Sequence, residues 1–189
     1  MLNVAALSKP HVVHQLAAEL SSSSTDVAVI TETHFKSKHS DSVVAIPDYT
    51  VFRRDRTGRR GGGVAVYVRS ALQSTIWQSP TTDSRQLPYQ LLWVRVGCVF
   101  VCAVYHPPRP PYTDESLINY FDVCVTELLR DYPSSLVLLA RDFNQLQNRD
   151  IIKCTGFTQL VSQLTPVAAR GCLPPGANVY VAAAIQIRN

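Results

Sequence analysis

The sequence predicts a layered α/β or α+β domain, because short apolar runs of strand length alternate with two segments of helical spacing. The chain has 189 residues, of which 46% are hydrophobic and 17% are charged. A length in this range corresponds to about one domain. The composition also excludes an intrinsically disordered chain, which combines low hydrophobicity with high charge. We therefore expect residues 1–189 to form a single domain, with an atypical pattern in residues 166–189.

Two segments have the spacing of amphipathic helices. The first covers residues 9–20, with Ser8 as its candidate cap and the serine run 21–24 at its end. Its apolar stripe consists of Val12, Leu16 and Leu20. The second begins after Thr113, a residue type that caps helices, and ends before Pro133. Its apolar stripe consists of Leu117, Phe121, Cys124 and Leu128.

Five apolar runs have the length and composition of strands. In chain order they are residues 26–30, 64–68, 91–96, 98–105 and 136–140. The third and fourth are separated by Gly97 and therefore predict a hairpin. Residues 178–187 are a candidate last strand.

Composition bears on membrane and disulfide chemistry. No apolar run approaches the roughly 18 residues of a membrane span. The first residues lack a charged segment followed by a long apolar one, so we expect no signal peptide and no membrane partner. The five cysteines are odd in number and show no CxxC spacing, which favours reduced thiols over disulfides or a zinc site. These features predict an intracellular protein, and the nucleus is compatible with them.

A basic cluster in residues 53–60 holds the whole net charge of +4. It contains one aspartate and five arginines, namely Arg53, Arg54, Arg56, Arg59 and Arg60. Such a cluster indicates an anionic partner, of which nucleic acid is the commonest. The alternative is a solvated loop without a ligand.

Polar residues occupy the ends of three predicted strands. Glu32 follows the first strand, Tyr105 ends the fourth, and Asp142 and Asn144 follow the fifth. Carboxylate oxygens suit Mg²⁺, which is completed by water and substrate phosphate. A phenol and an amide can donate to phosphate oxygens as charge develops there. Each residue alone also fits a surface, packed-loop or turn position, and their joint placement on strand ends is what favours a site.

Five blocks of the chain resemble one known family. They are residues 27–34, 49–56, 59–68, 104–112 and 138–146, in that order. Together they resemble the endonuclease domain of non-LTR (LINE-type) retrotransposons, within the endonuclease/exonuclease/phosphatase superfamily, over roughly residues 3–165. That superfamily also contains the apurinic-site endonucleases and deoxyribonuclease I.

The resemblance implies a four-layer α/β sandwich of the DNase I type, shortened at both ends, that cleaves phosphodiester bonds of DNA with Mg²⁺ or Mn²⁺. It implies that Glu32 and Asn3 lie beside the metal and that Tyr105 contacts the scissile phosphate. Asp142 would orient or deprotonate the attacking water, and Asn144 would support the phosphate. The five arginines of the basic cluster would contact the DNA backbone. The oligomeric state is left open.

The chain also departs from the family pattern. Arg141 stands where the family has glycine, the opening block at residues 3–7 lacks its arginine, and the closing Ser-Asp-His block has no counterpart. After Asp150 there is no Asp, Glu or His. Loss of one member of a catalytic unit commonly costs several orders of magnitude in rate. We therefore expect weak or absent catalysis. A noncatalytic nucleic-acid-binding remnant and a small-molecule or lipid phosphoesterase are the alternatives.

Two histidines are candidates to replace the histidine of the missing Ser-Asp-His block. His34 and His106 both lie next to predicted strand ends. We expect both to be ordinary loop residues.

Overall fold

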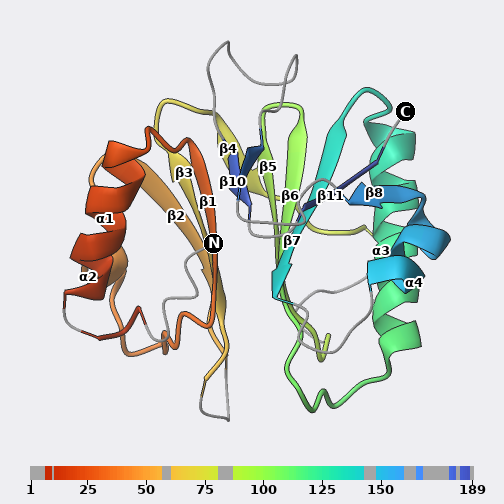
Figure 1. Cartoon of the computed structure of the whole chain (residues 1–189), viewed down its shortest axis with the longest axis horizontal. Coiled ribbons are helices and arrows are strands. Elements are labelled where there is room, and N and C mark those ends of the chain that lie inside the picture. Colours follow the sequence, from red (N-terminus) through yellow and green to blue (C-terminus); the bar gives the residue numbers. More distant parts are fainter. Residues whose placement is uncertain are drawn as a thin grey trace.

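The protein is a mixed α/β structure with two β-sheets (Figure 1). The computed structural model describes residues 7–9, 11–56, 61–80, 87–142, 148–159, 165–167, 179–181 and 184–187. In this part of the chain the two sheets face each other, α1 and α2 lie outside one sheet, and α3 and α4 lie outside the other (Figure 1). The predicted α/β layering is confirmed.

The first sheet, which we call sheet A, has the strand order β2-β3-β1-β10-β9. Its strands are β1 (Val27–Thr31), β2 (Tyr49–Arg54), β3 (Val64–Arg69), β9 (Thr165–Val167) and β10 (Val179–Val181). Strand β1 pairs antiparallel with β3 and parallel with β10. The helices on its outer side are α1 (Val12–Ser22) and the short α2 (Asp41–Val44).

The second sheet, sheet B, has the order β4-β5-β6-β7-β11-β8. Its strands are β4 (Ser74–Ile76), β5 (Gln90–Val96), β6 (Val99–Tyr105), β7 (Leu136–Asp142), β8 (Phe157–Gln159) and β11 (Ala184–Ile187). Strands β5 and β6 form the predicted hairpin, with Gly97 at a φ of 59° in its turn. Strands β6 and β7 are parallel, so α3 (Asp114–Asp131) is the crossover between them. Helix α4 (Asn148–Thr155) follows β7.

Three apolar clusters fill the spaces between these layers. The one between the sheets contains the alternate residues Val99, Val101, Ala103 and Tyr105 of β6. The residues between them, Phe100, Cys102 and Val104, pack toward α3. Because successive side chains of a strand point to opposite faces, β6 is buried on both sides and reads as a continuous apolar run.

The long helix α3 forms as its sequence predicts. The Thr113 hydroxyl accepts a hydrogen bond from the Ser116 backbone amide at 3.2 Å, which satisfies one of the free donors at the helix start. Every member of the predicted stripe is 0% exposed, namely Leu117, Phe121, Cys124 and Leu128. This stripe attaches α3 to sheet B.

Three sequence-based expectations are corrected. The first helix starts at Val12 rather than residue 9; its N-cap is His11, with a φ of 73° and no capping side chain, so Ser8 is not the cap. The candidate last strand 178–187 is two strands, because β10 joins sheet A and β11 joins sheet B. Two residues of the basic cluster, Arg53 and Arg54, belong to β2 rather than to a loop, because β2 pairs with β3 along its full length.

Three of the five cysteines have side chains that the structure describes. Cys98, Cys102 and Cys124 are thiols rather than disulfide members, and Cys154 and Cys172 have side chains outside the described residues. Burial raises the pKa of the Cys124 thiol to about 11, so it is protonated at neutral pH and is not a nucleophile. No described helix has the length and apolarity needed to cross a bilayer.

The packing of α3 on sheet B can be tested by truncation. Leu128 is 0% exposed, whereas Val123 on the same helix is 44% exposed. We expect Leu128→Ala to lower the free energy of unfolding by about 2–5 kcal/mol, because it leaves a cavity. Val123→Ala should change it by no more than about 0.5 kcal/mol. Urea unfolding followed by circular dichroism measures both, and equal effects would contradict this packing.

Candidate functional site

The ends of β1, β6 and β7 meet at one end of the two sheets, the lower end in Figure 1. After β1, the amide of Thr33 donates to the Gly63 carbonyl at 3.3 Å. The amide of Gly63 donates in turn to Gln90 Oε1 at 3.0 Å, which connects sheet A to the first residue of β5. Gln90 is the register partner of Tyr105, and Tyr105 is the register partner of Asp142. This series of contacts runs from the loop after β1 to the last residue of β7.

Gln90 and Tyr105 face the space between the sheets. Tyr105 is 4% exposed and belongs to the inter-sheet cluster. On β5 the inter-sheet residues are Leu92, Val94 and Val96, so the period of two places Gln90 on the same side. Its bond to Gly63 of sheet A agrees with that direction. Opposed residues on one face of a sheet lie about 5 Å apart, so Gln90 and Tyr105 are direct neighbours.

Glu32 stands directly after β1 in an uncommon backbone conformation. Its φ is 53°, and that of His34 is 56°. Such left-handed conformations cost non-glycine residues about 1–3 kcal/mol and persist where the surroundings hold them. Here the amides of Thr33 and His34 donate to the carbonyls of Gly63 and Gly62, at 3.3 and 2.9 Å. The turn of three glycines at residues 61–63, which we call the glycine turn, therefore holds the loop that carries Glu32.

The Glu32 carboxylate is partly exposed and lies beside an imidazole. Glu32 Oε2 is 3.8 Å from His34 Nε2. The preceding residue, Thr31, follows Val27 and Val29 at intervals of two and so lies on the inter-sheet face of β1. Its buried Oγ1 has no hydrogen-bond partner among the described residues. A hard oxygen donor beside an unsatisfied hydroxyl suits a hydrated Mg²⁺. Within the described residues, no group of three or more His, Cys, Asp or Glu is gathered around it.

The three consecutive glycines 61–63 are required by this geometry. Their φ values are 75°, 72° and 86°, a region that favours glycine. A Cβ at Gly62 would collide with Gln90 Oε1, and one at Gly63 would lie 2.6 Å from Thr33 Oγ1. These glycines belong to one of the blocks that resemble the family, but neither spacing nor periodicity predicts that residue 63 contacts residue 90.

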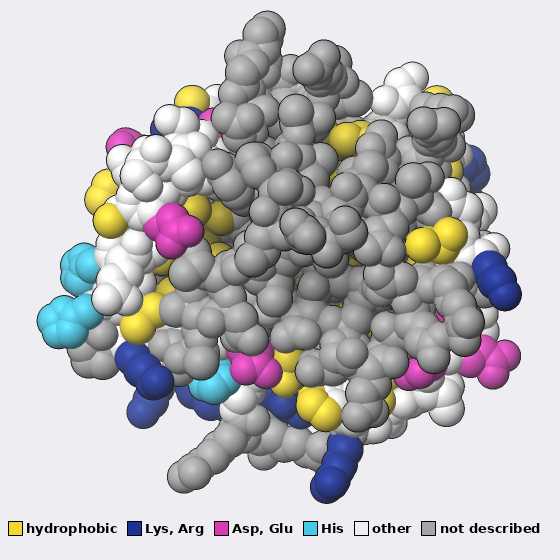
Figure 2. All heavy atoms as spheres, viewed as in Figure 1, with side chains coloured by type: hydrophobic (Ala, Val, Ile, Leu, Met, Phe, Trp, Pro, Cys, Tyr) yellow, Lys and Arg dark blue, Asp and Glu magenta, His cyan; other side chains and the backbone are white. Residues whose placement is uncertain are grey.

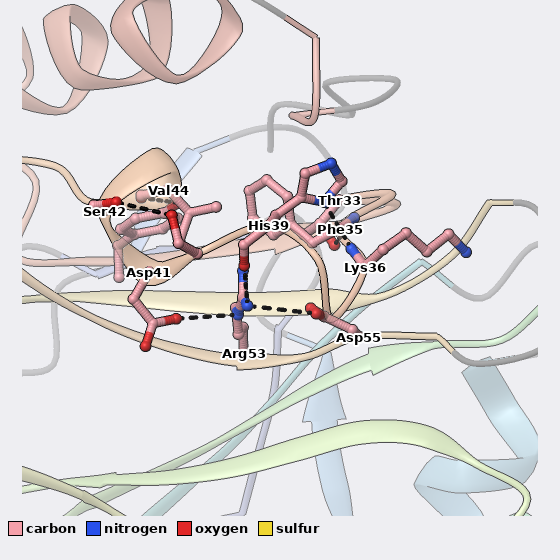
Figure 3. A network of polar contacts seen from close by, with 11 residues as sticks. Thr33, Phe35, Lys36, His39, Asp41, Ser42, Val44, Arg53 and Asp55 are labelled. Carbon is pink, nitrogen blue, oxygen red and sulfur yellow. Dashed lines mark hydrogen bonds and ion pairs between the residues drawn. The ribbon is translucent and has the colours of Figure 1, made fainter.

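Arg53 of the basic cluster is engaged with the protein itself (Figure 3). Its side chain is 17% exposed, and its Nη2 donates to the His39 carbonyl at 2.6 Å. Its guanidinium also lies 3.5 Å from Asp41 and 3.6 Å from Asp55. The ring of Phe35 lies beneath it, 5.7 Å from Arg53 Cζ. Arg53 therefore attaches the segment after Glu32 to β2.

The other arginines of the cluster differ in position. Arg54 crosses to sheet B and donates to the carbonyls of Leu91 and Leu87, at 3.4 and 3.5 Å. Arg56 follows β2, and its carbonyl accepts from Lys36 Nζ at 3.4 Å. On the face shown in Figure 2, Lys and Arg side chains lie along the lower rim, together with His and acidic side chains.

Several predicted site residues lie outside the described part of the chain. These are Asn3, Asn144, Arg59 and Arg60. For Asp142 the structure describes the backbone, which ends β7 opposite Tyr105. The structure thus brings together the strand ends that carry Tyr105 and Asp142 with the loop that carries Glu32, and the roles of these residues stay predictions.

The two candidate replacements for the histidine of the Ser-Asp-His block are His34 and His106. Both lie outside helices and strands, as expected. His34 adjoins Glu32. His106 is 3% exposed; its Nε2 is 3.7 Å from Asp114 Oδ1, and its Nδ1 is 3.3 Å from the Tyr112 hydroxyl. Since Tyr112 packs against the cluster under α3, His106 belongs to the packing of that layer.

Comparison with known proteins agrees with this arrangement. Residues 2–155 match the endonuclease/exonuclease/phosphatase family. The chain belongs to this family. It is also 33% identical over 109 residues to the RNA-directed DNA polymerase from mobile element jockey of Drosophila funebris, a match that covers 58% of this chain and 12% of that relative. The resemblance to a retrotransposon protein is therefore confirmed.

Two solved structures have a similar fold. The AP endonuclease LMAP from Leishmania major matches 98% of this chain and 77% of its own, with a TM-score of 0.62 and 12% identity. The 3' phosphatase NExo from Neisseria, solved with a product DNA hairpin, matches 97% of this chain and 83% of its own, with a TM-score of 0.60 and 14% identity. At these identities the likeness concerns the fold.

The glycine turn gives a prediction with an internal control. Gly63 and Gly156 both have a positive φ, but a Cβ at Gly156 would meet nothing within 4 Å. Gly156→Ala should cost about 1–2 kcal/mol of stability from backbone strain alone. Gly63→Ala should cost about 1–3 kcal/mol more, because its methyl group also collides with Thr33. Chemical denaturation measures both, and equal losses would show that the Gly63 contact is unimportant.

Proposed function

We propose that this chain is the DNA endonuclease domain of a retrotransposon and hydrolyses phosphodiester bonds with Mg²⁺ or Mn²⁺. The observation that carries the proposal is that the strand ends bearing Tyr105 and Asp142 lie at the same end of the sheets as the loop bearing Glu32, connected through Gly63 and Gln90. A jockey-type mobile-element relative supports a DNA substrate. An intracellular location, with access to nuclear DNA, is part of the same proposal.

Each residue has a role that follows from its chemistry. Glu32 and Asn3 would hold the metal ion, which supplies positive charge to neutralise the phosphate. The Tyr105 phenol would donate to a nonbridging oxygen of the scissile phosphate. The Asp142 carboxylate would accept a proton from the attacking water or orient it, and the Asn144 amide would donate to the phosphate.

We further propose that catalysis by these 189 residues is slow. After Asp150 they contain no carboxylate and no histidine, and this stretch supplies β10 and β11 in the middle of both sheets. The resemblance implies an imidazole oriented by a carboxylate from this region, in the Ser-Asp-His block that has no counterpart here. Arg141, in place of glycine, adds bulk beside Asp142. The same facts favour the second candidate, a protein that binds DNA without cutting it. A phosphoesterase acting on small molecules or lipids is the third.

Nicking of supercoiled plasmid tests the first proposal. We expect slow Mg²⁺-dependent nicking that Asp142→Asn lowers by about 100-fold or more, because the general base is lost. Asp131→Asn is the control, since Asp131 is an exposed residue of α3 paired with Arg130. Nicking that survives Asp142→Asn would contradict the site. Absence of nicking with every divalent metal tested, while DNA binding persists, would favour the noncatalytic candidate.

Salt-dependent DNA binding tests the basic cluster. We expect Arg59→Ala with Arg60→Ala to weaken binding and to reduce the slope of log K against log salt by about 2, because about one counterion is released per phosphate contact. Arg53→Ala should instead lower stability, because its donors and its ring contact lie within the protein. Arg130→Ala, on the outer helix, is the control. An unchanged slope in the double variant would exclude Arg59 and Arg60 as contacts.

A further inference from the structure

A cavity of about 340 Å³ lies between the β2 edge of sheet A and the β4–β5 edge of sheet B. The residues that give it chemical character are Arg53, Arg54, Asp55, Trp77, Trp93 and Tyr120. No sequence pattern predicts that these six residues line one cavity.

Arg54 lines this cavity and has no carboxylate partner among the described residues. Its hydrogen bonds to the backbone carbonyls of Leu91 and Leu87 are long, at 3.4 and 3.5 Å. Its guanidinium is partly buried, and this burial lowers its pKa. Arg53 and Asp55 neutralise one another at 3.6 Å, so the net charge of the lining is that of Arg54. A partly buried guanidinium in this state favours an anion.

The rest of the lining is aromatic. The rings of Trp77 and Trp93 meet edge to face, with centroids 5.6 Å apart. The indole Nε1 of Trp93 donates to the Tyr120 hydroxyl at 3.3 Å, so its polar atom is already satisfied. Trp77 is only partly buried. A planar apolar group can therefore lie against the Trp77 side of the cavity.

Backbone pairing and hydrogen bonds connect the cavity to the candidate site. Arg54 is the register partner of Val64, the residue after Gly63, and Gly63 donates to Gln90. The backbone carbonyl of Leu91, the residue after Gln90, accepts from Arg54. A polynucleotide with one phosphate at Tyr105 would therefore carry a neighbouring nucleotide toward this cavity.

We propose that the cavity is a subsite for one nucleotide of the substrate, with its phosphate on Arg54 and its base against Trp77. This inference rests on the proposed function and favours a DNA substrate over a small molecule or a lipid. In this proposal Arg54 contacts the substrate. Its sequence neighbour Arg53 instead contacts His39, Asp41 and Asp55 of the same chain.

The chain contains two tryptophans, and both line the cavity, so intrinsic fluorescence reports on this site. The test titrates the protein with thymidine 5′-monophosphate in the presence of EDTA, so that neither metal nor cleavage is involved. We expect a saturable change in tryptophan emission. Thymidine and inorganic phosphate, titrated separately, should each bind at least about tenfold more weakly, because each lacks one of the two groups recognised.

Arg54→Met keeps the length and apolar stem of the side chain and removes its charge. We expect it to weaken binding of the nucleotide at least about tenfold. Arg130→Met is the matched control on the outer helix, and it should bind as the unchanged protein does. Circular dichroism checks that each variant is folded, and the comparison of nucleotide with nucleoside in the unchanged protein does not depend on any variant.

Three results would overturn the proposal. They are no change in emission, equal binding of inorganic phosphate and nucleotide, and binding that Arg54→Met leaves intact. Because the assay needs no cleavage, its failure is separate from that of the proposed function. Nucleotide binding without nicking would contradict the endonuclease activity and support the subsite. Nicking without nucleotide binding would support the endonuclease activity and contradict the subsite.

Discussion

The hydrogen bond from the Gly63 amide to the Gln90 side chain connects the two sheets at the end where the candidate site lies. On one side of it, the glycine turn holds the strained loop of Glu32 and His34. On the other side, Gln90 stands beside Tyr105, which stands beside Asp142. A backbone amide can only donate, so the bond also fixes which end of the Gln90 carboxamide faces the turn. The relative position of the candidate groups depends on this contact.

The elements whose signals are local could be predicted from the sequence. The hairpin of β5 and β6 and the helix α3 carry their periodicity, turn glycine and capping threonine within a few residues. The start of α1 was misplaced because Ser8 had the right chemistry for a cap, while the chain turns at His11 instead. The split of residues 178–187 into β10 and β11 depends on pairing with two distant strands, and no local pattern carries that information.

The residues of the candidate site also fall into two groups, those with a local sequence signal and those that depend on distant contacts. Glu32, Tyr105 and Asp142 could be found because each follows or ends an apolar run, and the strand ends do meet. Gln90 and the function of the glycine turn could not be found, because they depend on a contact between residues far apart in sequence. The arginines looked equivalent as charges. Their difference comes from strand alternation in β2, which directs Arg54 into the space between the sheets and Arg53 toward Phe35 and His39.

The placement of β10 and β11 has a consequence for how the molecule assembles. Residues 179–187 supply an interior strand to each sheet, next to β1 in one and β7 in the other. Until they arrive from the ribosome, β1 and β7 each present an unpaired hydrogen-bonding edge, and both strands are strongly apolar. Pairing over such a sequence separation is slow. A nascent chain of this kind therefore exposes two apolar strand edges for longer than a protein whose last strand joins a sheet margin.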